Sequence, residues 1–174
     1  RLGGQLDVST PGVEYNTGSL GHVLGIAAGV ALAAKLDSRD YRAYAIMGDA
    51  ECYEGSIWEA MIFAGEHGLD KLVGIIDRNR LSVTDVMDDN FFNNMTQKVK
   101  AFDWECYDID GHSFPEIIDA LEAAKNANRP VMIIANTVKG KGVSFMENGV
   151  KWHHSVPTES EVLIARKELS LELG

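Results

Sequence analysis

Segment 48–81 constrains the fold of this chain more than any other stretch of its sequence. The apolar run 43–47 leads into it, apolar residues at helical spacing follow, and a second apolar run covers 72–76. A strand, a helix and a strand over this length are typical of a βαβ unit. Because the helix returns the chain to the same end of the sheet, the two strands are expected to be parallel.

A polar side chain follows each of these two predicted strands. Asp49 comes just after the first strand and Asn79 just after the second. In open α/β sheets, ligands bind at the carboxyl ends of the parallel strands. Carboxylate and amide oxygens suit Mg²⁺, which completes its shell with phosphate oxygens and water. The spacing therefore predicts a site for a metal and a diphosphate. The alternative is a polar turn that holds no metal.

The rest of the chain continues the alternation of helices and strands. We therefore expect an α/β fold in which a parallel sheet carries helices on both faces, as one domain over residues 1–174. The helix between the two apolar runs is expected to end at Gly68, and Ser56 and Glu59 fit a capping box at its start. Further helices are expected over 20–35, 95–101, 113–126 and 158–172, and further strands over 104–109 and 131–136.

Composition narrows the class of function. A net charge of −10 argues against a nucleic-acid partner, which requires a basic surface. The longest apolar stretch, 20–36, contains His22 and is too short for a confident membrane span. Cys52 and Cys106 show no C-x-x-C spacing, which favours a reducing, cytoplasmic setting. Residues 1–17 predict a loop, an unusual start that suggests a missing N-terminal segment.

Several blocks of the chain together resemble one family. The blocks are TPGVEYNTGSLGHVLGIAAGVALAAKL, GDAECYEGSIWEA, IIDRNRL, DGHSFPEIIDALEAA and RPVMIIANTVKGKGVSFMENGVKWHH. They resemble the pyrophosphate-binding domain of transketolases, in the same order and over nearly the whole chain. The resemblance implies the thiamine diphosphate-binding fold, with thiamine diphosphate and Mg²⁺ or Ca²⁺ as cofactors.

The resemblance also implies which residues hold these cofactors. Asp49, Asn79 and the backbone carbonyl of Leu81 match the metal ligands of the family. Lys139 and Lys141 could neutralise phosphate or could be solvated loop lysines. The residues that match cofactor contacts are Gly18, Ser19, Leu20, Gly21, Gly48, Asp49, Ala50, Glu51, Asn79, Leu81, Lys139 and His153.

Three side chains match catalytic positions of the family. Glu54 and Glu59 match acids that help to relay protons between paired active sites. For Glu59 the capping box is an alternative role, and for Glu54 the alternative is a solvated loop acid. His153 matches a histidine near the diphosphate and the reacting centre, and its neighbour His154 is the other candidate for that position.

The chain also departs from the family pattern. Ala50 replaces the second glycine of the diphosphate motif, and His22 replaces a common glutamine. Transketolases usually carry Gly-His-Pro shortly before Thr-Pro-Gly, but residues 3–7 contain no histidine. Because that histidine contacts the substrate in the family, its absence suggests a changed donor or acceptor, or reduced activity.

The resemblance implies the N-terminal subunit of a two-subunit transketolase, active only with its partner. The partner, a C-terminal subunit, would supply the pyrimidine-binding domain and its activating glutamate in an α2β2 assembly, and the helix 20–35 would pack at that interface. The reaction would transfer a two-carbon ketol unit from a ketose to an aldose, with phosphorylated or otherwise anionic sugars. The alternatives are a deoxyxylulose phosphate synthase-like or 2-oxoacid dehydrogenase-like component, and a non-catalytic cofactor-binding subunit.

Overall fold

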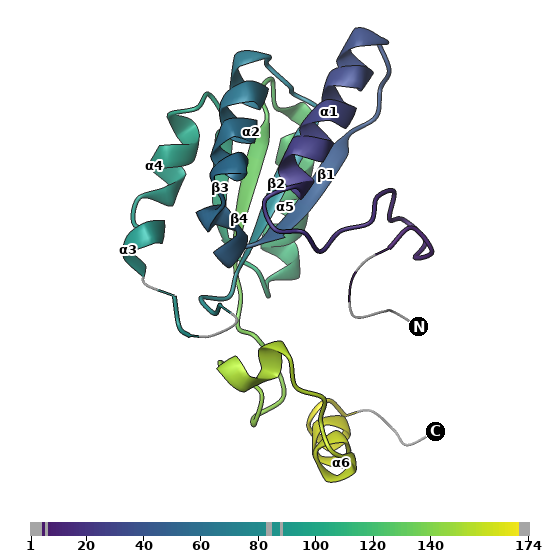
Figure 1. Cartoon of the computed structure of the whole chain (residues 1–174), viewed down its shortest axis with the longest axis vertical. Helices are drawn as coiled ribbons and strands as arrows, with labels where there is room; N and C mark the ends of the chain where they lie inside the picture. Colours follow the sequence, from purple (N-terminus) through teal and green to yellow (C-terminus); the bar gives the residue numbers. More distant parts are fainter. Residues whose placement is uncertain (1–4, 6, 83–84, 88, 171–174) are drawn as a thin grey trace.

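A four-stranded parallel sheet forms the centre of the computed structural model, which describes residues 5, 7–82, 85–87 and 89–170 (Figure 1). The strands are β1 (Ala43–Gly48), β2 (Leu72–Arg78), β3 (Glu105–Asp110) and β4 (Val131–Asn136). Their order in the sheet is β1-β2-β4-β3, and every neighbouring pair is parallel. The predicted βαβ unit and its parallel sheet are therefore confirmed.

Helices cover both faces of the sheet, as predicted. Figure 1 shows α1 (Val23–Leu36) and α2 (Gly55–Glu66) side by side in front of it and α5 (Phe114–Asn126) behind it. The short helices α3 (Asp89–Phe92) and α4 (Met95–Lys100) lie beside α2, and η1 (Ala50–Tyr53) joins β1 to α2. Beyond β4, η2 (Val150–His153) and α6 (Glu159–Glu168) lie below the sheet. None of the helices in the described part of the chain combines the length and apolarity that a membrane crossing requires.

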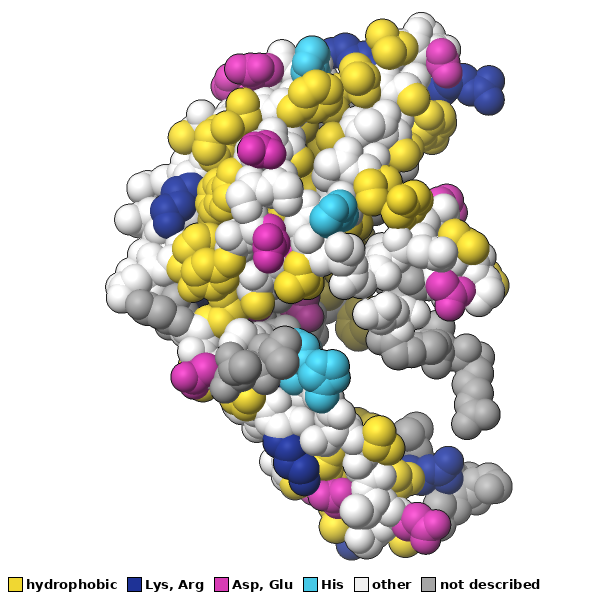
Figure 2. All heavy atoms as spheres, in the orientation of Figure 1, with side chains coloured by type: hydrophobic (Ala, Val, Ile, Leu, Met, Phe, Trp, Pro, Cys, Tyr) yellow, Lys and Arg dark blue, Asp and Glu magenta, His cyan; other side chains and the backbone are white. Residues whose placement is uncertain are grey.

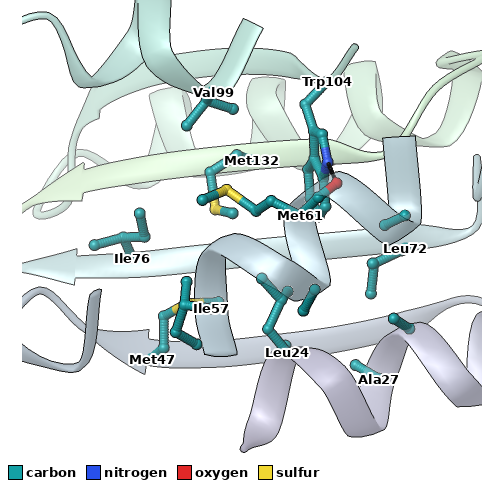
Figure 3. Packing of buried hydrophobic residues seen from close by; sticks show 14 of the residues in the cluster. Leu24, Ala27, Met47, Ile57, Met61, Leu72, Ile76, Val99, Trp104 and Met132 are labelled. Atoms are coloured by element: carbon teal, nitrogen blue, oxygen red, sulfur yellow. Dashed lines mark hydrogen bonds between the residues drawn. The ribbon is translucent and has the colours of Figure 1, made fainter. Parts of the chain in front are cut away.

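The larger core lies between the sheet and the helices of the front layer. Leu24 of α1 and Ile57 and Met61 of α2 are at most 2% exposed and point toward the strands (Figure 3). Trp104 closes this core, and its indole Nε1–H donates a hydrogen bond of 2.9 Å to the Met61 carbonyl, drawn dashed in Figure 3. This layer fixes α2, and with it the segment η1 that follows β1.

A smaller core lies on the other face, under α5. Ala120 and Ala124 of this helix pack against Val73, Val131 and Ile133 of β2 and β4. The small alanines allow the helix to approach closely, so apolar strand residues are buried on both faces of the sheet. This burial explains the continuous apolar runs of β2 and β4, which are typical of parallel strands covered on both faces.

The start of α2 differs from the sequence prediction. The helix begins at Gly55 with Glu54 as its N-cap residue, and no side chain caps it. Ser56 lies in the first turn, and its hydroxyl donates to the carbonyl of Gly21 at 2.8 Å. The predicted capping box with Glu59 is therefore wrong, because a distant backbone carbonyl takes the hydroxyl. The helix α1 also begins later than predicted, at Val23.

Candidate functional site

The carboxyl ends of the strands bring the predicted ligand positions to one end of the sheet. Gly48 of β1 pairs in register with Asp77 of β2, which pairs in turn with Ala135 of β4. The segments that follow these strands therefore begin side by side. Asp49 follows β1, and Asn79 follows β2.

Asp49 is a buried acid that binds the turn after the neighbouring strand. Asp49 is only 1% exposed to solvent. One carboxylate oxygen accepts the N–H of Ala50 at 2.8 Å, and the other accepts the N–H of Arg80 at 2.6 Å. Burial raises the pKa of Asp49, and the two backbone hydrogen bonds oppose this rise. The contact with Arg80 joins the ends of β1 and β2.

Asn79 shapes the same turn. Its amide oxygen accepts the N–H of Leu81 at 3.1 Å, which places Leu81 directly beside the Asn79 side chain. Arg80 between them has a φ of +61°, a left-handed conformation that non-glycine residues rarely adopt. Asn79 and Leu81 therefore lie in one tight turn, and the Arg80 N–H between them joins this turn to the Asp49 carboxylate.

The donor set fits a metal that is bound jointly with phosphate. No group of three or more His, Cys, Asp or Glu side chains that could hold a metal occurs among the residues the structure describes. Asp49 and Asn79 each keep free lone pairs after their backbone hydrogen bonds, because a carboxylate has about four and an amide oxygen two. One carboxylate, one amide and one backbone carbonyl leave the remaining ligands to diphosphate and water, as Mg²⁺ prefers.

Asp77 and Thr137 belong to this end of the sheet but were not singled out from the sequence. The backbone carbonyl of Asp77 accepts the N–H of Asp49 at 3.2 Å. Its carboxylate accepts hydrogen bonds from the hydroxyl of Thr137 and from the Asn79 amide at 3.4 Å. The sequence did carry one indication of this role, since Asp77 also stands at a strand end.

A pocket of about 380 Å³ lies between the segment before α1 and the end of β1. It brings together Gly18, Ser19 and Leu20, which were predicted to contact the cofactor, with the buried acid Glu51. Asp49, Asn79 and Leu81 do not line it. The lining residues are Tyr15, Asn16, Thr17, Gly18, Ser19, Leu20, His22, Val23, Ile26, Ile46 and Glu51.

Gln5 lies against the loop that forms this pocket. A Cβ on Gly18 would lie 2.6 Å from the Gln5 side-chain oxygen, and Gly18 has a φ of +122°. The positive φ favours glycine at this position, whereas the flexible end of the Gln5 side chain could move aside for a Cβ. Gln5 comes from the segment in which the family histidine is missing. Sequence reasoning did not single it out, because nothing in the sequence predicts that residue 5 meets residue 18.

Lys139 and His153 lie near each other beyond β4. His153 ends η2, its side chain is exposed, and its ring centroid is 5.2 Å from that of His154. Partial burial and the positive charge of Lys139 lower the pKa of His153, which favours the neutral imidazole. The structure records no hydrogen bond between these side chains and Asp49 or Asn79 in the part of the chain it describes. The lysine and the histidines thus form a second group of candidate residues.

Glu54 and Glu59 are both exposed in this chain. Glu54 is the N-cap residue of α2, and its Cβ and Cγ lie close to Gly21. Ala50 opens η1, where its N–H meets Asp49, and its φ is not positive. The methyl group at position 50 therefore causes no backbone strain.

Known proteins are similar to this chain over almost its full length. One subunit of the apulose-4-phosphate transketolase of Phocaeicola vulgatus is 42% identical over 171 residues, 97% of this chain and 61% of the relative. The 6-deoxy-6-sulfo-D-fructose transketolase subunit SqwG of a Clostridium species is 41% identical over 165 residues, 94% of this chain and 60% of the relative. The chain thus spans about three fifths of the length of these relatives.

A solved structure agrees with the fold. The transketolase of Campylobacter jejuni superposes with a TM-score of 0.85 at 34% identity, over 95% of this chain and 27% of that protein. The resemblance noted from the sequence blocks is thereby confirmed. A family model described as the thiamine diphosphate binding domain of transketolase matches residues 4–173, and the chain therefore belongs to this family.

Proposed function

We propose that this chain is the cofactor-anchoring part of a transketolase that transfers a two-carbon ketol unit from a ketose to an aldose. The observation that carries the proposal is the buried Asp49, whose carboxylate meets the turn containing Asn79 and Leu81. A buried acid with free lone pairs at the carboxyl ends of parallel strands suits a metal that holds a diphosphate. The family to which the chain belongs binds such a cofactor.

Different residues of this chain would then bind the metal, the cofactor and the substrate. Asp49, Asn79 and the Leu81 carbonyl would hold Mg²⁺ or Ca²⁺, and Gly18 to Gly21 would lie along the cofactor. When bound, thiamine diphosphate supplies a nucleophilic carbon and an electron sink for cleaving the ketose. Lys139 would offset phosphate charge. His153, whose lowered pKa favours the neutral ring, would accept or donate a hydrogen bond at a substrate hydroxyl.

The activating glutamate is proposed to come from a partner subunit, in an α2β2 assembly. Two relatives are named as subunits of transketolases, which supports a divided enzyme. Figure 2 shows apolar side chains gathered over the face formed by α1 and α2, where Val30, Ile62 and Phe63 are exposed. We place the interface on this face. The exposed Glu54 and Glu59 would relay protons across it.

Sugar phosphates or other anionic sugars are the proposed substrates, since two relatives are named for a sugar phosphate and a sulfo-sugar. The cytoplasm is the proposed compartment, because Cys52 and Cys106 are both free and buried.

Co-purification with the candidate partner, followed by thiamine diphosphate titration with and without Mg²⁺, tests this function. We expect saturable binding that requires the metal, and turnover of ketose phosphates. Turnover of pyruvate in place of ketose would favour a deoxyxylulose phosphate synthase-like enzyme, and binding without any turnover would favour a non-catalytic subunit. A complex that shows no metal-dependent binding would refute the proposal.

The glycines on the exposed side of α1 give a separate prediction about the interface. At Gly29 a Cβ would meet nothing within 4 Å, so the surface there is open to a neighbour. Gly29→Leu is expected to weaken partner binding at least about tenfold, because the larger side chain would prevent close approach. Glu122→Leu on α5, across the sheet, serves as the control. Equal effects of both variants in a binding titration would place the interface elsewhere.

A further inference from the structure

We propose that Glu51 is a positioning residue, which acts through the backbone of Gly21 rather than by touching the cofactor. Together with Ser56, it fixes the loop 18–21, which is proposed to lie along the cofactor and whose residues 18–20 line the pocket beside Glu51. The inference rests on the proposed function, and it assigns to Glu51 a role different from the direct contact expected from the sequence.

Two side chains hold the Gly21 peptide backbone from separate positions. The Glu51 carboxylate accepts the N–H of Gly21 at 2.9 Å, and the Ser56 hydroxyl donates to the carbonyl of Gly21 at 2.8 Å. Gly21 itself is buried and has a φ of +83°. Both polar groups of this residue are therefore satisfied by side chains from η1 and α2, thirty or more positions along the chain.

The approach is close enough to require glycine. A Cβ at position 21 would lie 2.4 Å from the Ser56 hydroxyl and 2.8 Å from the Cβ of Glu54. Gly21 thus forms one packed unit with Glu51 and Ser56, in which no side chain fits at position 21. The loop cannot shift without breaking both hydrogen bonds.

The helix α1 depends on this unit for the position of its first turn. Its N-cap residue, His22, makes no side-chain cap, and its first turn contains no acidic residue. In most helices, a side chain at the N-cap or in the first turn of the same helix accepts a hydrogen bond from the first backbone N–H groups. Here the residue before the N-cap is instead held from outside by Glu51, whose negative charge also suits the positive end of the helix dipole.

Glu51 lies at a position from which the conformation of this loop could affect cofactor binding. It is 8% exposed and lines the pocket together with Gly18, Ser19 and Leu20. The negative charge of the Glu51 carboxylate would repel a diphosphate that contacted it. The hydrogen bond from the Gly21 N–H to Glu51 instead orients the loop. Loss of the acceptor leaves a buried N–H without a partner, which favours a different loop conformation.

Titration of thiamine diphosphate into the complex with Mg²⁺, by calorimetry, tests the proposal. Glu51→Ala is expected to weaken binding about tenfold, whereas Glu51→Gln, which keeps an oxygen acceptor, is expected to stay within about threefold of the native protein. Ser56→Ala should also weaken binding. The double variant should lose less binding free energy than the two single variants lose together, because both residues hold the backbone of Gly21. Hydrogen exchange should show a less protected Gly21 amide in Glu51→Ala without any cofactor.

Trp104→Phe is the matched control, since it removes another buried hydrogen bond to backbone, at Met61 of α2 rather than in the loop. It is expected to lower stability without weakening cofactor binding. The proposal is overturned if Glu51→Ala binds as tightly as the native complex, or if Glu51→Gln and Trp104→Phe weaken binding as much as Glu51→Ala does. A native complex that fails to bind the cofactor would instead refute the proposed function, and the exchange of the Gly21 amide would still report on Glu51.

Discussion

Gly65→Ala is expected to lower the free energy of unfolding by about 3 kcal/mol, the upper part of the range for overpacked cores. A Cβ at position 65 would lie 1.9 Å from the backbone carbonyl oxygen of Phe102. That oxygen cannot turn aside as a flexible side chain would. The segment is fixed by the hydrogen bond from the Phe102 N–H to Val99 and by Trp104, which binds the Met61 carbonyl of α2. The substitution would therefore push α2 away from this segment.

The same substitution in α1 supplies the control. Gly25 and Gly29 are also helical glycines, but a Cβ at either would meet nothing within 4 Å. Gly25→Ala and Gly29→Ala are expected to be neutral or to stabilise the chain by about 0.5–1 kcal/mol, since alanine favours helix. Urea unfolding monitored by tryptophan fluorescence measures both effects as shifts of the midpoint at constant m value. A Gly65→Ala protein as stable as the α1 variants would show that α2 is not packed closely against Phe102.

Elements that depend on local pattern could be predicted from the sequence. The apolar runs that became β1, β2 and β4 are short and bounded by polar residues, and α5 has a clear start at Ser113, whose hydroxyl accepts the N–H of Glu116. The parallel arrangement followed because helices connect the successive strands of the sheet. The placement of Asp49 and Asn79 at one end of the sheet followed in turn, since parallel strands share their carboxyl ends.

Features that depend on contacts between distant residues could not be predicted in this way. The sequence pattern S-x-x-E at Ser56 and Glu59 is consistent with a local cap, but the hydroxyl of Ser56 binds Gly21, 35 positions away. Likewise, no local pattern indicates that Glu51 accepts the Gly21 N–H, or that Gly65 meets Phe102. In each case the tertiary partner, rather than the neighbouring sequence, decides what the residue does.

The sequence predicted the types of residue in the candidate site, but not which residues lie together there. The resemblance to transketolases pointed to Asp49, Asn79 and Leu81, and the structure places them around one turn. Asp77 joins this group through a local hydrogen bond from the Asn79 amide, and the register of β2 and β4 brings the Thr137 hydroxyl to the Asp77 carboxylate. Lys139 and His153 follow β4 on the segment that leads into η2, and no hydrogen bond recorded for the described residues joins their side chains to Asp49 or Asn79.

Asp49→Ala is expected to weaken thiamine diphosphate binding to the complex in the presence of Mg²⁺ by about 100-fold, equivalent to about 2.7 kcal/mol. Asp49 carries the negative charge of the proposed ligand set, which otherwise contains an amide and a backbone carbonyl. Its removal also frees the N–H groups of Ala50 and Arg80, so the turn that carries Asn79 would lose its anchor. Both effects act on the same end of the cofactor.

The metal dependence separates loss of a ligand from general destabilisation. In the native complex, removal of Mg²⁺ with a chelator is expected to weaken binding strongly, whereas the Asp49→Ala complex should bind weakly with or without the metal. Non-additivity of this kind is the mark of two groups that act together. Asp119→Ala, at an exposed position on α5, should leave both affinities unchanged. If Asp49→Ala keeps the native dependence on Mg²⁺, then Asp49 holds the turn but not the metal, and the ligand set must be sought around Asp77 and Thr137.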